Sequence, residues 1–203
     1  MPVFARKLHL GSFDQAADGW LNTDVTPHML VARVPALPWL LHRVGVLQDG
    51  RYAAYRSGAF RSLRYLDVSR RFRFDDETFD CVYASHMLEH LHPDVAEHCV
   101  SEAHRVLRPD GVLRLAVPDL DQMVAGYDPA EPDAFLWGIY QGRGRRAKLT
   151  ARHWWHYNDA SLSALLSATG FHDPRRCEFR EGHCPDLDRI ETRRWSLFME
   201  ATK

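Results

Sequence analysis

The sequence predicts an α/β fold with a mostly parallel sheet, and two observations support this prediction. First, residues 79–121 contain a short apolar strand, a polar elbow, an amphipathic helix, a Pro-Asp-Gly turn and a second apolar strand. That order forms a β-α-β unit, which joins parallel strands. Second, the elbow carries His86, Glu89 and His90 just past the carboxyl end of its first strand, where open α/β sheets bind ligands.

Size and composition are those of a single globular domain spanning residues 1–203. The chain is 45% hydrophobic and 26% charged, and its net charge of −1 provides no overall attraction to nucleic acid or to an anionic membrane. The N-terminal MPVFARKLHLG lacks the apolar run of a signal peptide, and no segment is apolar enough to span a bilayer. None of the four cysteines forms a CxxC pair. We therefore expect a cytoplasmic protein that uses neither nucleic acid nor a membrane.

Short apolar runs predict five strands, and they are Lys7–Gly11, Trp20–Val25, Leu63–Val68, Cys81–Ser85 and Val112–Val117. Only eight residues, Ser12–Gly19, separate the first two. A β-α-β connection needs about 10–12 residues, so this first crossover is predicted to be truncated. Between the last two, the apolar spacing predicts a helix over Val95–Leu107, with Arg108 in its last turn.

Two insertions interrupt this pattern. The first, at about residues 26–62, is apolar but broken by Pro35 and Pro38, which predicts short helices or a cap lying over the sheet. The second, at about residues 122–158, holds a basic run, Arg143–Arg152, and the aromatic sequence HWWHY. After it, a helix over Asp159–Thr169 precedes two strand candidates, Arg175–Arg180 and Trp195–Thr202, which could form a hairpin closing one edge of the sheet.

These elements together resemble the class I S-adenosylmethionine-dependent methyltransferases, in particular the small methyltransferase-like group of sugar, cell-surface and natural-product pathways. The resemblance is carried by LHLG, GWLNTDV, LDVSRRFRFDDETFDCVYASHMLEHL, EAHRVLRPDGVLRLAVPDL, HWWHYNDASLSALLSATGF and SLFMEATK. It implies a single Rossmann-like methyltransferase domain, S-adenosyl-L-methionine as the cofactor, and two insertions that form the acceptor pocket or a lid.

The resemblance also assigns the cofactor-binding residues. Asp24, at the end of the second strand, would accept hydrogen bonds from the ribose hydroxyls, and Asp67, after the third, would bind the adenine amino group. The remaining positions line the cofactor, and they are Leu10, Gly11, Ser12, Val68, Ser85 and His86. The first motif departs from the family, because it has one glycine where two or three are usual. The G-x-G-x-x-G pattern of a dinucleotide-binding site is absent from the sequence.

Methyl transfer to a hydroxyl needs a nucleophile held about 3 Å from the methyl carbon and a base that takes the proton. His86, Glu89 and His90 stand at i, i+3 and i+4, one face of a helical turn, and could supply a base oriented by a carboxylate. The alternative to a catalytic role is a structural one, in which these residues cap backbone amides and pack within the elbow. Their H-x-x-E-H sequence is also similar to the E-x-x-E-H of some quinone-pathway O-methyltransferases, so a divalent ion such as Mg²⁺ stays an open alternative.

His153 is the second candidate base. It flanks Trp154 and Trp155, which could form an apolar wall against a sugar ring or an aromatic acceptor. It also corresponds to a histidine of the family pattern. The alternative is that the tryptophans anchor the insertion to the core.

These observations predict an O-methyltransferase acting on a hydroxyl of a small polar acceptor, with a saccharide or secondary metabolite as the first choice. One alternative is a non-catalytic methyltransferase-like scaffold or partner subunit, which the single glycine favours. Another is an enzyme with a nitrogen or carboxylate acceptor. The aromatic insertions could also serve a homodimer interface.

Overall fold

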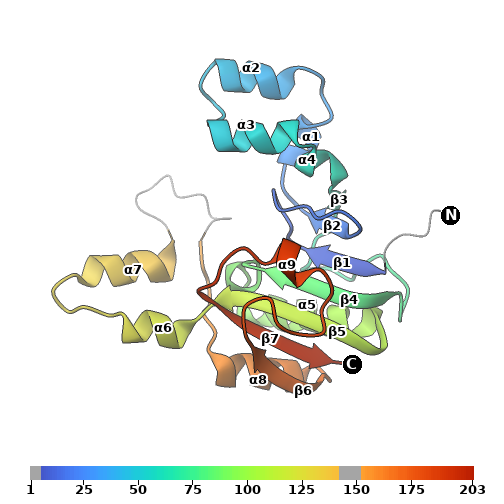
Figure 1. Ribbon diagram of the computed structural model, residues 1–203, viewed down its shortest axis with the longest axis vertical. Coiled ribbons are helices and arrows are strands. Elements are labelled where there is room, and N and C mark those ends of the chain that lie inside the picture. Colours follow the sequence, from blue (N-terminus) through green and yellow to red (C-terminus); the bar gives the residue numbers. More distant parts are fainter. Residues whose placement is uncertain (1–5, 142–151) are drawn as a thin grey trace.

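The computed structural model describes residues 6–141 and 152–203, which form a seven-stranded sheet flanked by helices (Figure 1). The strand order is β3-β2-β1-β4-β5-β7-β6. Strands β1 to β5 pair in parallel, and β7 is antiparallel to both β5 and β6. The strands are β1 (Lys7–Leu10), β2 (Leu21–Asp24), β3 (Arg64–Tyr65), β4 (Phe79–Ser85), β5 (Leu107–Pro118), β6 (His172–Cys177) and β7 (Ser196–Thr202). The predicted fold class, a mostly parallel sheet closed by an antiparallel pair, is confirmed.

One face of the sheet is covered by α5 (Pro93–Val106) and α8 (Asp159–Ala168). Strand residues that alternate toward this face are apolar, as in Leu113, Leu115 and Val117 of β5, and they join the buried sides of both helices. The resulting core is the largest in the molecule, and it also includes residues of β1, β4 and β7.

The opposite face is covered by a loop instead of a long helix. Residues 11–20, between β1 and β2, contain no helix, as their small number predicts. The chain from 178 to 195, which carries the short helix α9 (Leu187–Ile190), lies over this face (Figure 1). Leu187 and Ile190 pack there against Trp20 and Tyr83. The covering loop therefore takes the place that a complete first crossover would occupy.

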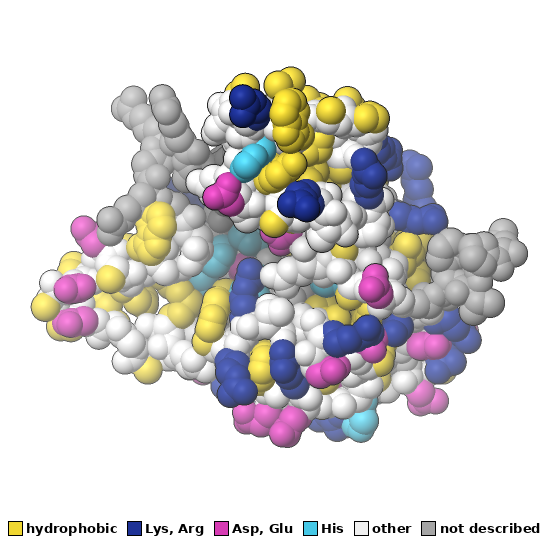
Figure 2. Space-filling view, turned by 45° about the horizontal axis from the view of Figure 1, so that its top comes forward, with side chains coloured by type: hydrophobic (Ala, Val, Ile, Leu, Met, Phe, Trp, Pro, Cys, Tyr) yellow, Lys and Arg dark blue, Asp and Glu magenta, His cyan; other side chains and the backbone are white. Residues whose placement is uncertain are grey.

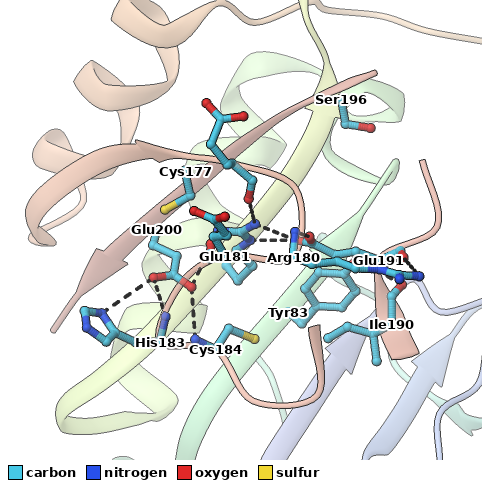
Figure 3. A network of polar contacts seen from close by, with 12 residues as sticks. Tyr83, Cys177, Arg180, Glu181, His183, Cys184, Ile190, Glu191, Ser196 and Glu200 are labelled. Carbon is cyan, nitrogen blue, oxygen red and sulfur yellow. Dashed lines mark hydrogen bonds and ion pairs between the residues drawn. The ribbon is translucent and has the colours of Figure 1, made fainter. Parts of the chain in front are cut away.

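A buried arginine holds the covering loop on the sheet. Arg114 of β5 is fully buried, and its guanidinium donates to the backbone oxygens of Glu181 at 2.9 Å and Glu178 at 3.1 Å. It also pairs with the carboxylate of Glu191 at 2.7 Å. Glu200 of β7 accepts the amide protons of two further loop residues, His183 and Cys184 (Figure 3). Backbone groups that the loop buries thus find partners in charged side chains of the sheet and of the loop itself.

Two helical extensions stand off from the sheet (Figure 1). The first insertion forms a lobe of short helices beside the β3–β2 edge, rather than a cap over a sheet face. Its helices are α1 (His28–Val31), α2 (Leu37–Arg43), α3 (Asp49–Arg56) and α4 (Ala59–Ser62). The second insertion begins with an arm made of α6 (Leu120–Ala125) and α7 (Pro132–Tyr140). Among the described residues, no helix is both long and apolar enough to cross a membrane.

Four predicted boundaries are wrong. The fifth strand begins at Leu107 rather than Val112, so the Pro-Asp-Gly sequence lies within β5 instead of forming a turn. The third strand is only Arg64–Tyr65, because Asp67 begins a turn by accepting hydrogen bonds from Ser69. Helix α5 ends at Val106, so Arg108 lies in β5, where it pairs with Asp80 instead of capping the helix. The last edge strand is His172–Cys177 rather than Arg175–Arg180, and the four cysteines are free.

Replacing Arg114 by methionine should unfold the protein more easily. The change leaves Glu191 and the loop carbonyls buried without their partner, and breaking a buried ion pair typically costs about 3–5 kcal/mol. Arg108→Met is the matched control, because that side chain is 46% exposed and its pair with Asp80 is worth at most about 1 kcal/mol. Urea unfolding of both variants measures the difference. Equal losses of stability would show that the covering loop does not depend on Arg114.

Candidate active site

The loop after β1 makes a close approach to the elbow after β4. Gly11 has a φ of +61°, and a Cβ at this position would lie 2.4 Å from Cγ of Met87. The amide of Ser12 donates to the carbonyl of Thr23 at 3.0 Å, which folds the loop onto the end of β2. Glycine is therefore required here both by the left-handed backbone and by the contact with Met87.

The two predicted acids, Asp24 and Asp67, lie at the ends of neighbouring strands. The carboxylate of Asp24 accepts the amide protons of Phe13 at 3.1 Å and Thr26 at 2.7 Å. Burial raises the pKa of Asp24 above its ordinary value, against the effect of those two hydrogen bonds. The hydrogen bond from the Ser69 hydroxyl lowers the pKa of Asp67. Both acids hold their own loops. Each oxygen of Asp24 keeps a lone pair for a further donor, whereas in Asp67 only Oδ2, which pairs with Arg70, does so, because Oδ1 accepts two hydrogen bonds from Ser69.

The elbow after β4 places His86 in an unusual backbone conformation. Its φ is +49°, a region that non-glycine residues seldom adopt and that often marks functional sites. Its Nδ1 donates to Oε1 of Glu89 at 3.1 Å, and its Nε2 accepts from the hydroxyl of Ser196 at 2.8 Å. The ring packs edge-on against Trp195 at 4.9 Å. Both nitrogens of His86 thus have partners, and the side chain is only 7% exposed.

Glu89 is a completely buried carboxylate in the single 3₁₀ turn η1 (Leu88–His90). Burial alone would raise its pKa. The hydrogen bond from His86 and the electrostatic effects of His86 and His90 outweigh burial and bring the pKa of Glu89 below its ordinary value. The carboxylate therefore carries a negative charge at neutral pH.

The structure joins the elbow to the HWWHY segment, which the sequence analysis treated as a separate candidate. The backbone oxygen of Glu89 accepts the amide protons of Trp154 at 2.8 Å and Trp155 at 3.3 Å. Nδ1 of His90 donates to the carbonyl of Arg152 at 3.0 Å, and the rings of His90 and His153 are 4.8 Å apart. Three of the four predicted catalytic residues, Glu89, His90 and His153, thus meet in one cluster, and His86 contacts it through Glu89.

His153 is held as a neutral imidazole at physiological pH. Burial lowers the pKa of His153 to about 4, against the attraction of the Glu89 carboxylate. Its Nδ1 is buried and has no hydrogen-bond partner among the described residues. A neutral ring with an unused lone pair can accept a proton or bind a metal ion.

Exposed tryptophans surround this histidine cluster. Trp154 and Trp155, beside His153, are 37% and 48% exposed, and Trp195, beside His86, is 55% exposed. Figure 2 shows histidine and acidic side chains at the bottom of the recess between the α1–α4 lobe and the α6–α7 arm. Sequence reasoning missed Trp195 and Ser196 as site residues, because it placed them in a strand 110 positions from His86.

Two other polar features of the sequence are a basic run and Asp119. The basic run Arg143–Arg152 lies outside the described residues, except for Arg152. Asp119, at the end of β5, is a helix cap, since its side chain accepts the amide protons of Asp121 and Gln122 at the start of α6.

Comparison with known proteins agrees with this fold. Residues 48–115 match a family described as "Methyltransferase domain", a stretch that includes Asp67 and the elbow but not Gly11 or Asp24. A search of curated proteins gave no match. Solved structures that cover the whole chain include a SAM-dependent methyltransferase from Archaeoglobus fulgidus (TM-score 0.55, 15% identity, 89% of that chain) and one from Mesorhizobium loti (0.53, 15%, 94%). The CurJ carbon methyltransferase also matches (0.51, 16%, 50% of that chain).

The family match covers residues 48–115, about a third of the chain, and the similar structures are 15–16% identical to it, so together they show the fold of a methyltransferase domain. The match and the fold support methyltransferase activity with S-adenosylmethionine as the cofactor. A carbon methyltransferase stands among the similar structures, so the fold leaves open which acceptor atom is methylated.

Substituting Gly11 by alanine should destabilise the protein by about 2–4 kcal/mol. The left-handed backbone contributes roughly 1–2 kcal/mol of this and the contact with Met87 the rest. In the double variant Gly11→Ala with Met87→Ala this contact is absent. Urea unfolding of the wild type, the two single variants and the double variant should therefore show a favourable coupling free energy of about 1–3 kcal/mol between the two substitutions. Additive effects would mean that the two loops do not constrain each other.

Proposed function

We propose that this protein is an O-methyltransferase that transfers the methyl group to a hydroxyl of a small polar acceptor, with a saccharide or secondary metabolite as the first choice. The observation that supports it is the cluster of Glu89, His90 and His153, which places neutral imidazole and a buried carboxylate past the end of β4. This is the edge of a parallel sheet at which ligands bind.

The residues at this edge suit the cofactor in their chemistry. Asp24 and Asp67 keep oxygen lone pairs that can accept from ribose hydroxyls and the adenine amino group, and Gly11 lets the first loop close on the elbow. Leu10, Ser12, Val68 and Ser85 complete the proposed set. When bound, S-adenosylmethionine supplies a methyl group activated on a sulfonium. The protein then has to orient the acceptor, exclude water and receive the hydroxyl proton.

His153 is a better proton acceptor than His86. Both ring nitrogens of His86 have partners, whereas Nδ1 of His153 has none among the described residues. The His153 ring as a whole is half-buried rather than enclosed, whereas its Nδ1 itself is buried. We assign His86 to the positioning of Glu89, and the carboxylate of Glu89 to stabilising a positive charge that forms on the cluster.

The acceptor class is inferred from the tryptophans. Trp154, Trp155 and Trp195 expose flat apolar surface beside polar groups of the cluster. Such a combination binds rings that carry hydroxyl groups, because the ring face packs on indole while the hydroxyls reach polar side chains.

Asp24→Asn should weaken binding of S-adenosylhomocysteine by at least about tenfold, because the amide group replaces one acceptor oxygen by a donor. Asp18→Asn is the control, since Asp18 is an exposed residue of the loop that precedes β2. Isothermal titration calorimetry on both variants measures the effect, with unfolding curves to confirm that they are folded. Unchanged affinity in Asp24→Asn would exclude Asp24 from the cofactor site. No binding by folded wild-type protein would favour a scaffold over an enzyme.

His153→Gln should lower turnover by about 10²–10⁴-fold, the usual contribution of a general base, while leaving the affinity for S-adenosylhomocysteine unchanged. Release of S-adenosylhomocysteine with a panel of hydroxylated acceptors, sugars first, gives the rate. His172→Gln is the control, because His172 is exposed on β6 at the far edge of the sheet. Full turnover of His153→Gln would remove this residue from proton transfer and would favour an acceptor that needs no base.

A further inference from the structure

Three potential metal ligands from two distant segments converge in the histidine cluster. Glu89 and His90 belong to the elbow after β4, whereas His153 belongs to the segment that precedes α8. Each offers one ligand atom, and these atoms all lie within 4.8 Å of one another. The backbone hydrogen bonds from Trp154 and Trp155 to Glu89 hold the two segments together independently of these side chains.

The donor atoms of the cluster are left free by the rest of the structure. Oε2 of Glu89 and Nδ1 of His153 are buried and have no hydrogen-bond partner among the described residues. Nδ1 of His90 donates to the Arg152 carbonyl, so the lone pair of His90 is on Nε2. Buried polar atoms without partners are rare and costly, and the two in this cluster, on Glu89 and His153, are atoms that a bound cation would satisfy.

We propose that Glu89, His90 and His153 form a binding site for a divalent transition-metal ion of the Zn²⁺ type. Two imidazole nitrogens and one carboxylate oxygen are ligands that Zn²⁺ and similar ions prefer, whereas Mg²⁺ prefers oxygen alone. The same combination of two histidines and one glutamate occurs in catalytic zinc sites. This set differs from the one that the elbow sequence suggested, because His86 has both nitrogens engaged and His153 replaces it.

The surroundings of the three ligands also match those of a metal site. Histidines that bind metal usually donate their other ring N–H to a backbone carbonyl or a carboxylate. His90 does so to the Arg152 carbonyl, and the second oxygen of Glu89 is held by His86. His86 is in turn fixed by Ser196. These contacts orient the ligands before an ion binds.

Three protein ligands leave at least one coordination position open, as in catalytic rather than structural zinc sites. His90 and His153 are half-buried and the neighbouring Trp154 and Trp155 are exposed, so we expect an acceptor to reach the open position from this side. A hydroxyl oxygen of the acceptor would fit there, and coordination would lower the pKa of that hydroxyl. This role rests on the proposed function, because His153 would then serve as a ligand and no longer as the base. The metal site itself rests only on the three side chains.

Metal titration of the purified protein, stripped with a chelator, tests the site. We expect one Zn²⁺ to bind per chain by isothermal titration calorimetry, and Co²⁺ in its place to give visible absorption bands of low-coordinate Co²⁺. His153→Gln and Glu89→Gln should each weaken Zn²⁺ binding by about 10–100-fold or more, since loss of an outer-shell contact alone has an effect of that size. His172→Gln, the exposed histidine of β6, should bind Zn²⁺ as the wild type does.

Two outcomes would overturn the proposal. One is Zn²⁺ binding with the same affinity in wild type, His153→Gln and Glu89→Gln, which would place the ion elsewhere among the histidines. The other is the absence of stoichiometric Zn²⁺ binding, or binding of Mg²⁺ more tightly than Zn²⁺. His153 is half-exposed, so the His153→Gln result stands even if Glu89→Gln fails to fold.

Parallel titration with S-adenosylhomocysteine separates this site from the proposed function. Normal binding of S-adenosylhomocysteine without Zn²⁺ binding would overturn the metal site alone. Zn²⁺ binding that is lost in His153→Gln, in a protein that does not bind S-adenosylhomocysteine, would support the metal site and overturn the proposed function.

Discussion

The buried guanidinium of Arg114 is the interaction on which the rest of this structure depends. The connection between β1 and β2 is too short for a crossover helix, so one face of the sheet would lie open to solvent. The loop of residues 178–195 covers it, and a loop in such a place buries backbone groups that need partners. Arg114 supplies donors to two loop carbonyls and neutralises Glu191, while Glu200 accepts two loop amides. The polar network thus makes a loop possible where the fold normally uses a helix.

The same loop connects the sheet to the candidate active site. It ends at Trp195, which packs against the ring of His86, and the next residue, Ser196 at the start of β7, contacts Nε2 of that ring, whereas Glu89 contacts Nδ1. His86 in turn holds Oε1 of Glu89 and leaves Oε2 for the histidine cluster. A continuous series of contacts therefore runs from the covering loop to the site. We infer that the loop does more than shield the sheet, because it determines the orientation of the buried carboxylate.

The sequence predicted local structure well and long-range contacts poorly, for physical reasons. Strand periodicity located β1, β2 and β4 to within two residues at each end, and the short linker predicted the missing crossover. The length of the strand around Arg64 was overestimated, because an edge strand ends where its pairing with the neighbouring strand ends, and not where the strand propensity of its residues ends. The meeting of His153 with Glu89 could not be predicted from side-chain patterns, since the bonds that join the two segments go to a backbone oxygen. The residue roles assigned to Gly11, Asp24 and Asp67 stay predictions.

The charge of the cluster limits which acceptors it can serve. Methyl transfer to a hydroxyl moves positive charge away from a sulfonium and onto the group that receives the proton. Glu89 is fully buried and negatively charged, so it would stabilise this charge wherever it arises on His90, His153 or a bound ion. An acceptor carboxylate would be repelled by the same charge and would gain nothing from neutral imidazole. With no ion bound, this charge would disfavour an anionic acceptor, which supports the proposed neutral hydroxyl, whereas a bound Zn²⁺ would remove the preference.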